Sequence, residues 1–339
     1  MSAAKVELGR WLFYDRRLSG NQTFSCASCH QQSRAFTDGR PRALGATGEK
    51  HPRGAMTLTN VAYNLRFNWG DPRTKSLEEQ MLVPMLGHHP VELGLTSKKE
   101  LVSRLREDVD YRERFAEAFP GRRSLTFRNA TRAIAAFERT LISGDSAYDR
   151  RVFADDREAM GAAAERGMRL FHSDRLRCDE CHGGFNFSGP VTFLGAARLE
   201  PEFHNTGLFD LDGAGAYPAP NRGVFEHTRR PADMGRFRAP TLRNVELTAP
   251  YLHDGSLATL EEVIDFYAAG GRDAGRASPL KSDKVAGFEI SAKEKADVVE
   301  FLKSLTDRKF VTDPRFSDPF RPSRPSVAPG QADRQRAPR

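Results

Sequence analysis

Two short stretches decide how this chain folds: Cys26-Ala27-Ser28-Cys29-His30 and Cys178-Asp179-Glu180-Cys181-His182. Both have the pattern C-x-x-C-H, and together they use all four cysteines of the 339 residues. Two thiols about one helical turn apart can add to the two vinyl groups of one porphyrin, and the adjacent histidine can ligate its iron. The pattern therefore predicts two covalently bound c-type haems. Cys26, Cys29 and His30 would hold one, and Cys178, Cys181 and His182 the other.

Three other uses of these cysteines fit less well. A structural zinc site would need both C-x-x-C pairs in one small knuckle, whereas the two motifs lie in different halves of the chain. A dithiol redox pair would not explain a histidine directly after each second cysteine. A disulfide framework is not expected in a chain of this length with so few cysteines.

The segments around the two motifs indicate an internal duplication. Residues 9–18 and 167–176 share Gly, Leu, Phe, Arg and Leu at the same spacing, and each precedes one motif. Each half then closes with an amphipathic helix, marked by Ile134, Phe137 and Leu141 in the first and by Val298, Leu302 and Leu305 in the second. The sequence therefore predicts a mainly α protein with long irregular loops. It would contain two cytochrome c-like domains, at 1–145 and 146–305, each with one haem.

Charge is unevenly distributed along the chain. The formal net charge is +7, but residues 306–339 carry eight Lys or Arg and four Asp or Glu, and they are rich in proline. We expect this segment to be an extended, partly disordered tail. The remaining body is close to neutral, so composition does not favour a nucleic-acid partner. No apolar run is long enough for a membrane span, and residues after Met1 do not resemble a signal peptide.

Two further helix starts lie outside the haem motifs. Ser76 and Glu79 have the spacing of a capping box, as do Thr259 and Glu262. The helix after Thr259 would carry Leu260, Val263, Ile264 and Tyr267 on its apolar face. Ser291 and Glu294 form a third such pair before the closing helix of the second domain.

At this level of detail the chain resembles the bacterial di-haem cytochrome c peroxidase and MauG family over nearly all of residues 4–305. The resemblance rests on Leu12-Phe13-Tyr14-Asp15, both C-x-x-C-H motifs, Ser76-Leu77-Glu78-Glu79-Gln80, Pro90-Val91-Glu92 and residues 240–255. Within the family it is most similar to the di-haem enzymes associated with methanobactin gene clusters. That closer likeness rests on residues 51–56, 203–208 and 233–240.

The resemblance implies roles around the first haem, which reacts with peroxide and would have His30 as its proximal ligand. Gln80, Pro84 and Glu92 match the residues of the family's distal pocket. Glu92 would move protons during peroxide cleavage. The alternative is that Glu92 is an exposed loop carboxylate with no catalytic role. Trp69 matches the tryptophan that relays electrons between the haems, although packing alone is the alternative role.

The resemblance also implies the ligands of the second haem. His182 would be proximal, and Tyr267 stands where the MauG-like branch has a tyrosine ligand and the peroxidases have a methionine. A phenolate lowers a haem's potential relative to methionine. Tyr267 as a core residue and ligation by Met234 are the alternatives.

Two family features are altered in this chain. Ala46 stands where peroxidases that require reductive activation have a distal histidine, so the first haem should be five-coordinate and ready for peroxide; His51 is nearby but not at that position. The family's calcium site would use Thr248 and Pro250, but its asparagine is replaced by Gly54. Calcium is therefore only a possible cofactor.

The resemblance implies a MauG-like peroxidase that uses H2O2 to oxidise a residue of a periplasmic partner protein, with conversion of tryptophan to kynurenine as the expected reaction. One alternative is a conventional peroxidase that takes electrons from a small cytochrome or cupredoxin. The other is a non-enzymatic electron carrier. Haem attachment takes place outside the inner membrane, so a periplasmic location is expected.

Overall fold

The computed structural model describes residues 1–195 and 200–321, and within these residues it is helical with no extended sheet. Strand pairing there is limited to isolated bridges, such as Asn64 with Val191. The mainly α architecture predicted from the sequence is therefore confirmed. Its helices are α1 (Ala3–Tyr14), α2 (Cys26–Cys29), α3 (Leu77–Gln80), α4 (Leu82–Leu86), α5 (Lys98–Glu107), α6 (Val109–Ala118), α7 (Phe127–Glu138), α8 (Ala147–Phe153), α9 (Ala162–Phe171), α10 (Asp179–His182), α11 (Phe225–Thr228), α12 (Leu260–Ala268) and α13 (Ala292–Ser304).

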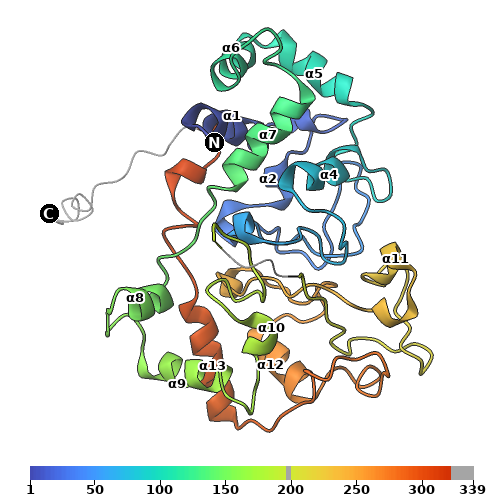
Figure 1. The fold of residues 1–339 in the computed structure, drawn as a ribbon, viewed down its shortest axis with the longest axis vertical. Helices are drawn as coiled ribbons and strands as arrows, with labels where there is room; N and C mark the ends of the chain where they lie inside the picture. Colours follow the sequence, from blue (N-terminus) through green and yellow to red (C-terminus); the bar gives the residue numbers. More distant parts are fainter. Residues whose placement is uncertain (196–199, 322–339) are drawn as a thin grey trace, which may run out of the picture.

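The two halves of the chain are built on the same helix pair, one above the other in Figure 1. Helix α1 packs against α7, and α9 packs against α13. Each crossing depends on a glycine: a Cβ atom on Gly9 would lie 1.9 Å from the carbonyl oxygen of Ala133, and one on Gly167 would lie 1.9 Å from that of Asp297. Only glycine allows two helix backbones to approach this closely. The duplication is thus present in the packing as well as in the sequence.

A second repeat joins the halves at their interface. Asn60 and Asn244 both adopt left-handed backbone conformations, with φ of 55° and 61°, and each leads into a short 3-10 helix. The Asn60 amide donates to the carbonyl of Ser143, and the Asn244 amide donates to the hydroxyl of the same serine. Because all three side chains are buried, this network fixes how the halves meet.

The segment after α13 differs from the tail expected from its composition. Residues 306–321 return from the second half to the first, as the red end of the described chain shows in Figure 1. Phe310 and Phe316 are 3% and 5% exposed and pack in the hydrophobic core of the first half of the chain. Tyr14 donates a hydrogen bond to the carbonyl of Phe316 at 2.6 Å. Two apolar anchors therefore outweigh the polar composition here; residues 322–339 of the predicted tail lie outside the described residues.

The predicted helix starts are present with one difference. Thr259 with Glu262 and Ser291 with Glu294 form reciprocal capping boxes. Ser76 caps α3 by accepting from the Glu79 amide, but the Glu79 carboxylate accepts from Lys75 rather than from Ser76. That cap is therefore only half of a capping box.

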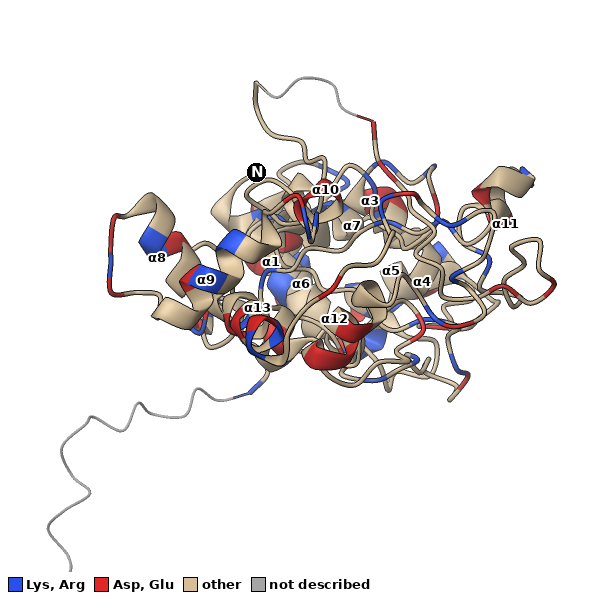
Figure 2. Ribbon diagram, turned by 90° about the horizontal axis from the view of Figure 1, so that it is seen from below, with Lys and Arg blue, Asp and Glu red and all other residues tan. Residues whose placement is uncertain are grey.

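Charged residues of both signs are interspersed along the helices and loops, as the blue and red segments of the ribbon in Figure 2 show. This distribution agrees with the near-neutral body deduced from composition. Within the described residues, no helix is long and apolar enough to cross a membrane.

Candidate active site

The first C-x-x-C-H motif lies at one wall of a cavity of about 790 Å³. Ser25 and Ser28 cap the single turn of α2, which brings Cys26, Cys29 and His30 to the same cavity. The Nδ1 atom of His30 lies 2.9 Å from the carbonyl oxygen of Phe36. A hydrogen bond there orients the ring and leaves Nε2 as the nitrogen available for a metal.

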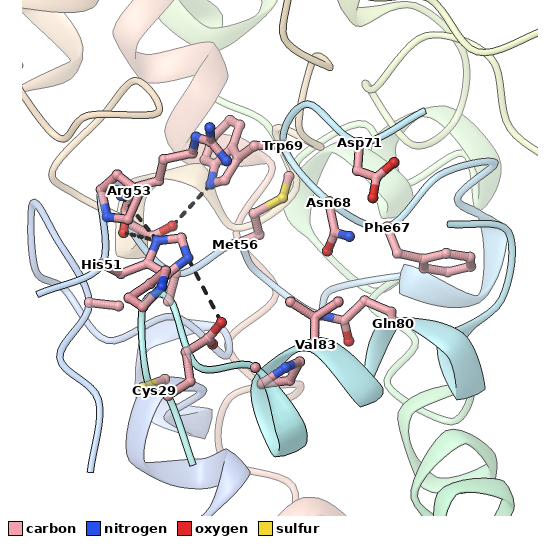
Figure 3. A pocket seen from close by; sticks show the side chains of 18 of the residues that line it. Cys29, His51, Arg53, Met56, Phe67, Asn68, Trp69, Asp71, Gln80 and Val83 are labelled. Carbon is pink, nitrogen blue, oxygen red and sulfur yellow. Dashed lines mark hydrogen bonds and ion pairs between the residues drawn. The ribbon is translucent and has the colours of Figure 1, made fainter. Parts of the chain in front are cut away.

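The same cavity is lined by the predicted distal residues. Gln80 at the end of α3, Pro84 in α4 and Glu92 in the following loop all face it. Burial raises the pKa of Glu92 to about 7. The Nε2 atom of His51 lies 3.8 Å from Oε1 of Glu92, the contact drawn as a dashed line from His51 in Figure 3. Burial also lowers the pKa of His51 to about 4, so this imidazole is neutral at physiological pH.

The second motif lines a separate cavity of about 250 Å³. Cys178, Cys181 and His182 reach it from α10, and Tyr267 reaches it from the apolar face of α12. The Nδ1 atom of His182 lies 3.0 Å from the carbonyl oxygen of Phe187. This repeats the His30 arrangement in the first cavity.

The cysteine and histidine side chains of both cavities have the chemistry that a covalently attached haem requires. All four cysteines are free thiols, and burial raises the pKa of Cys29 to about 12 and that of Cys181 to about 11, so the sulfurs are neutral. Burial lowers the pKa of His30 and of His182, so both imidazoles can offer a lone pair to iron. The cysteine pairs lie in different cavities, and no group of three or more His, Cys, Asp or Glu side chains in the described residues could hold a metal ion. A shared zinc site is thereby excluded for these cysteines.

Trp69 lies in the wall between the cavities and lines both of them. Its indole Nε1 donates to the carbonyl of Gly54 at 3.0 Å, which holds the ring in place (Figure 3). The ring centroid lies 6.4 Å from that of His253, in an edge-on orientation. The predicted relay residue is therefore positioned between the two candidate haem sites.

The remaining predicted ligands differ in whether they reach a cavity. Tyr267 lines the second cavity and Met234 does not, although both side chains pack against the same small core of Leu208, Tyr217, Phe237 and Phe266. Thr248 and Pro250 lie along the same cavity as Gly54. Gly54 supplies no side-chain oxygen, so the residues present do not reproduce the family's calcium ligands.

Several residues of the site had no assigned role at the sequence level. His51 faces Glu92, and His253 stacks on Phe237 with ring centroids 3.7 Å apart. Arg238 lines both cavities. Glu138, on the inner face of α7, also lines the first cavity, and burial raises its pKa to about 8. Arg238 lies within residues 233–240, one of the stretches that carry the family resemblance.

Comparisons with known proteins agree with this geometry. The sequence model of the family described as di-haem cytochrome c peroxidase matches residues 3–157. The methylamine utilization protein MauG of Methylorubrum extorquens is 35% identical over 90% of this chain and 79% of its own length. The cytochrome c551 peroxidase of Pseudomonas aeruginosa is 30% identical over 98% of this chain and 86% of its own length.

This chain belongs to the di-haem cytochrome c peroxidase and MauG family. Membership makes it a haem peroxidase, an oxidoreductase that uses H2O2, and implies two c-type haems. The expectation of a plain electron carrier is thereby set aside.

Solved structures extend the comparison. The fold matches the crystal structure of a MauG-like protein associated with microbial copper homeostasis, with a TM-score of 0.92 and 48% identity over 95% of this chain and 94% of that one. The di-haem peroxidase BthA of Burkholderia thailandensis has the same fold at 21% identity, with a TM-score of 0.72 over 91% of this chain and 87% of that one.

Proposed function

We propose that this protein is a MauG-like di-haem peroxidase that uses H2O2 to oxidise a tryptophan of a partner protein to kynurenine. The observation that carries the choice of the MauG-like branch is Tyr267, which faces the second cavity while Met234 does not line it. The 48% identity to a MauG-like protein associated with microbial copper homeostasis supports the same choice.

Two haems would be held by the residues that line the cavities. Cys26 and Cys29 would attach the first haem and Cys178 and Cys181 the second, as thioethers. When bound, haem supplies the iron that binds peroxide and stores oxidising equivalents. His30 and His182 each keep Nε2 free for iron, because Nδ1 is engaged with a backbone carbonyl.

Glu92 would move the protons of the peroxide reaction. Cleavage of the O–O bond requires a proton to leave the oxygen nearer the iron and another to reach the departing oxygen. A carboxyl with a pKa of about 7 exists in both forms near neutral pH, so it can accept a proton and return it. The Nε2 atom of His51 is 3.8 Å away and neutral, so it adds no positive charge beside the carboxylate. Gln80 and Pro84 would restrict the space around the peroxide.

Tyr267 would act on the second haem. It lines the same cavity as Cys178 and Cys181, and burial raises its pKa. A phenol that loses this proton on binding ferric iron would contribute a negative charge, which stabilises oxidised over reduced iron. Trp69, which lines both cavities, would carry electrons between them.

The substrate reaction balances with peroxide as the sole oxidant. Tryptophan and two equivalents of H2O2 give N-formylkynurenine and two waters, and hydrolysis then releases formate and leaves kynurenine. The alternative function is a conventional peroxidase that reduces H2O2 with electrons from a small cytochrome or cupredoxin. It is favoured by the relatives named as cytochrome c peroxidases, including the Escherichia coli protein at 33% identity over 89% of this chain and 58% of that protein. Either function would operate in the periplasm, where c-type haems are attached.

Two assays on the same haem-loaded preparation separate these functions. The first supplies H2O2 and a small tryptophan-containing protein, and measures that protein's mass and the near-ultraviolet absorbance of kynurenine. The second supplies H2O2 and a reduced small cytochrome or cupredoxin, and measures the donor's oxidation. Kynurenine formation without rapid donor turnover supports the proposal, and rapid donor turnover without change in the partner overturns it.

A further inference from the structure

The wall between the two cavities contains one unusual charge. Gly54, Ala55, Met56, Thr57, Trp69 and Arg238 line both cavities, and among these residues only Arg238 is ionisable. Arg238 also borders a third, small cavity beside Cys181. A single guanidinium is therefore placed beside both candidate haem sites.

Arg238 has no anionic partner within the described chain. Its backbone amide donates to the carbonyl of Trp69 at 2.9 Å, but its side chain makes little polar contact. Nη2 lies 3.6 Å from the sulfur of Met56, and the buried Nε atom has no hydrogen-bond partner.

Arg40, Arg42 and Lys50 also have no ion-pair partner in the described chain, but each of them lines only one of the two cavities, and two further cations are paired. Arg53 binds Glu226 at 2.8 Å, in the first cavity, and Lys284 binds Glu202 at 3.2 Å, beside the second. Arg238 thus differs from Arg53 and Lys284, which are already paired with a carboxylate. Its guanidinium can bind a carboxylate that does not belong to the described chain.

The positive charge of Arg238 would be stabilised by an anion at the wall between the two cavities. Burial lowers the pKa of its guanidinium to about 10, so the side chain remains cationic at neutral pH. A buried charge without a counterion is strongly unfavourable. Each haem of this family brings two propionate carboxylates, and a guanidinium can bind a carboxylate through two parallel hydrogen bonds.

We propose that Arg238 is a shared anchor for the haem propionates, pairing with a carboxylate of each haem at the wall that also holds Trp69. The proposal rests on the haem binding of the proposed function and adds a positioning residue to it. A cation near both irons favours the reduced state of each, because reduction lowers the positive charge of the iron centre. One side chain would therefore influence both reduction potentials. The hydrogen bond from its backbone amide to the Trp69 carbonyl would hold Trp69 in a fixed position relative to the propionates.

The test is a spectroelectrochemical titration of the haem-loaded protein without peroxide, following the high-spin and low-spin haems separately. Arg238→Gln is expected to move both midpoint potentials to more negative values, and Arg238→Lys to move both by less, because it keeps the charge. The matched controls are Arg42→Gln, which lines only the first cavity, and Arg40→Gln, which lines only the second. Neither control is expected to move both potentials.

Three results would overturn the proposal: unchanged potentials in Arg238→Gln, a shift at one haem only, or an equal shift with Lys and Gln. Haem content is measured first by the pyridine haemochrome spectrum. If Arg238→Gln fails to retain both haems, the potentials are measured in Arg238→Lys instead. Midpoint potentials equal to those of the unmodified protein at both haems would then refute the role of Arg238 as a propionate anchor. Because no peroxide is present, these outcomes are independent of whether the protein oxidises tryptophan.

Discussion

Replacing Glu92 by glutamine tests the proton chemistry of the first cavity. Glutamine keeps the size of the side chain but cannot accept a proton. Positioned proton transfer contributes about 10²–10⁴-fold to reactions of this kind. We therefore expect the second-order rate constant for H2O2, measured by stopped-flow absorbance of the haem bands, to fall by roughly this factor, which corresponds to about 3–5 kcal/mol of transition-state stabilisation.

The pKa of Glu92 adds a pH signature to this prediction. Burial raises it to about 7, so the proton-accepting carboxylate form increases as pH rises through neutrality. The ionised fraction grows from about one tenth at pH 6 to about nine tenths at pH 8, and the rate should rise roughly tenfold over this range. His51 does not ionise in this window, because burial lowers its pKa to about 4. In Glu92→Gln the remaining rate should be flat across the same range.

Glu49→Gln is the matched control for this variant. Glu49 lines the same cavity, but its carboxylate accepts a hydrogen bond from the amide of Val91, a contact that the oxygen of glutamine can retain. We expect this control to keep both the rate and its rise with pH. A Glu92→Gln protein with an unchanged rate or an unchanged pH profile would refute the assignment of Glu92.

Three further substitutions test separate parts of the account. Trp69→Phe should leave the rate of the peroxide reaction at the first haem unchanged. In stopped-flow traces it should slow the spectral change of the second haem by at least tenfold, which corresponds to about 1.4 kcal/mol. An unchanged rate at the second haem would show that Trp69 has only a packing role. Tyr267→Met should raise the reduction potential of the second haem, and an unchanged potential would contradict its role as ligand. Gly167→Ala should lower the free energy of unfolding by about 1–3 kcal/mol in thermal or denaturant melts, because its Cβ would meet the Asp297 carbonyl at 1.9 Å. Gly144→Ala, where a Cβ has open space, should change it little, and a similar loss in both variants would show that the helix crossing is not the cause.

The sequence was most informative where chemistry needs a local pattern. The C-x-x-C-H motifs place three ligating or linking groups within one helical turn, and the structure brings each set to its own cavity. The repeated glycine before each motif was also visible, although its reason, a contact with the carbonyl of Ala133 or Asp297, depends on a helix more than a hundred residues away.

Features formed by distant segments were harder to predict. Arg238 borders both cavities only because residues 54–57 and Trp69 pack against it. The pairing of His51 with Glu92 likewise joins two loops that no local periodicity connects. Residues 306–321 looked like a tail because proline and charge dominate their composition, whereas Phe310 and Phe316 bind them to the first core.

The most direct test of the central claim is the addition of one equivalent of H2O2 to the ferric, haem-loaded protein without prior reduction, followed by optical and electron paramagnetic resonance spectroscopy. We expect a starting mixture of one high-spin and one low-spin haem, and a change at both haems after a single equivalent. A reaction that requires half-reduction would favour the conventional peroxidase. No change at either haem would contradict the claim that the Glu92 cavity reacts with peroxide and shares its oxidising equivalents with the Tyr267 cavity.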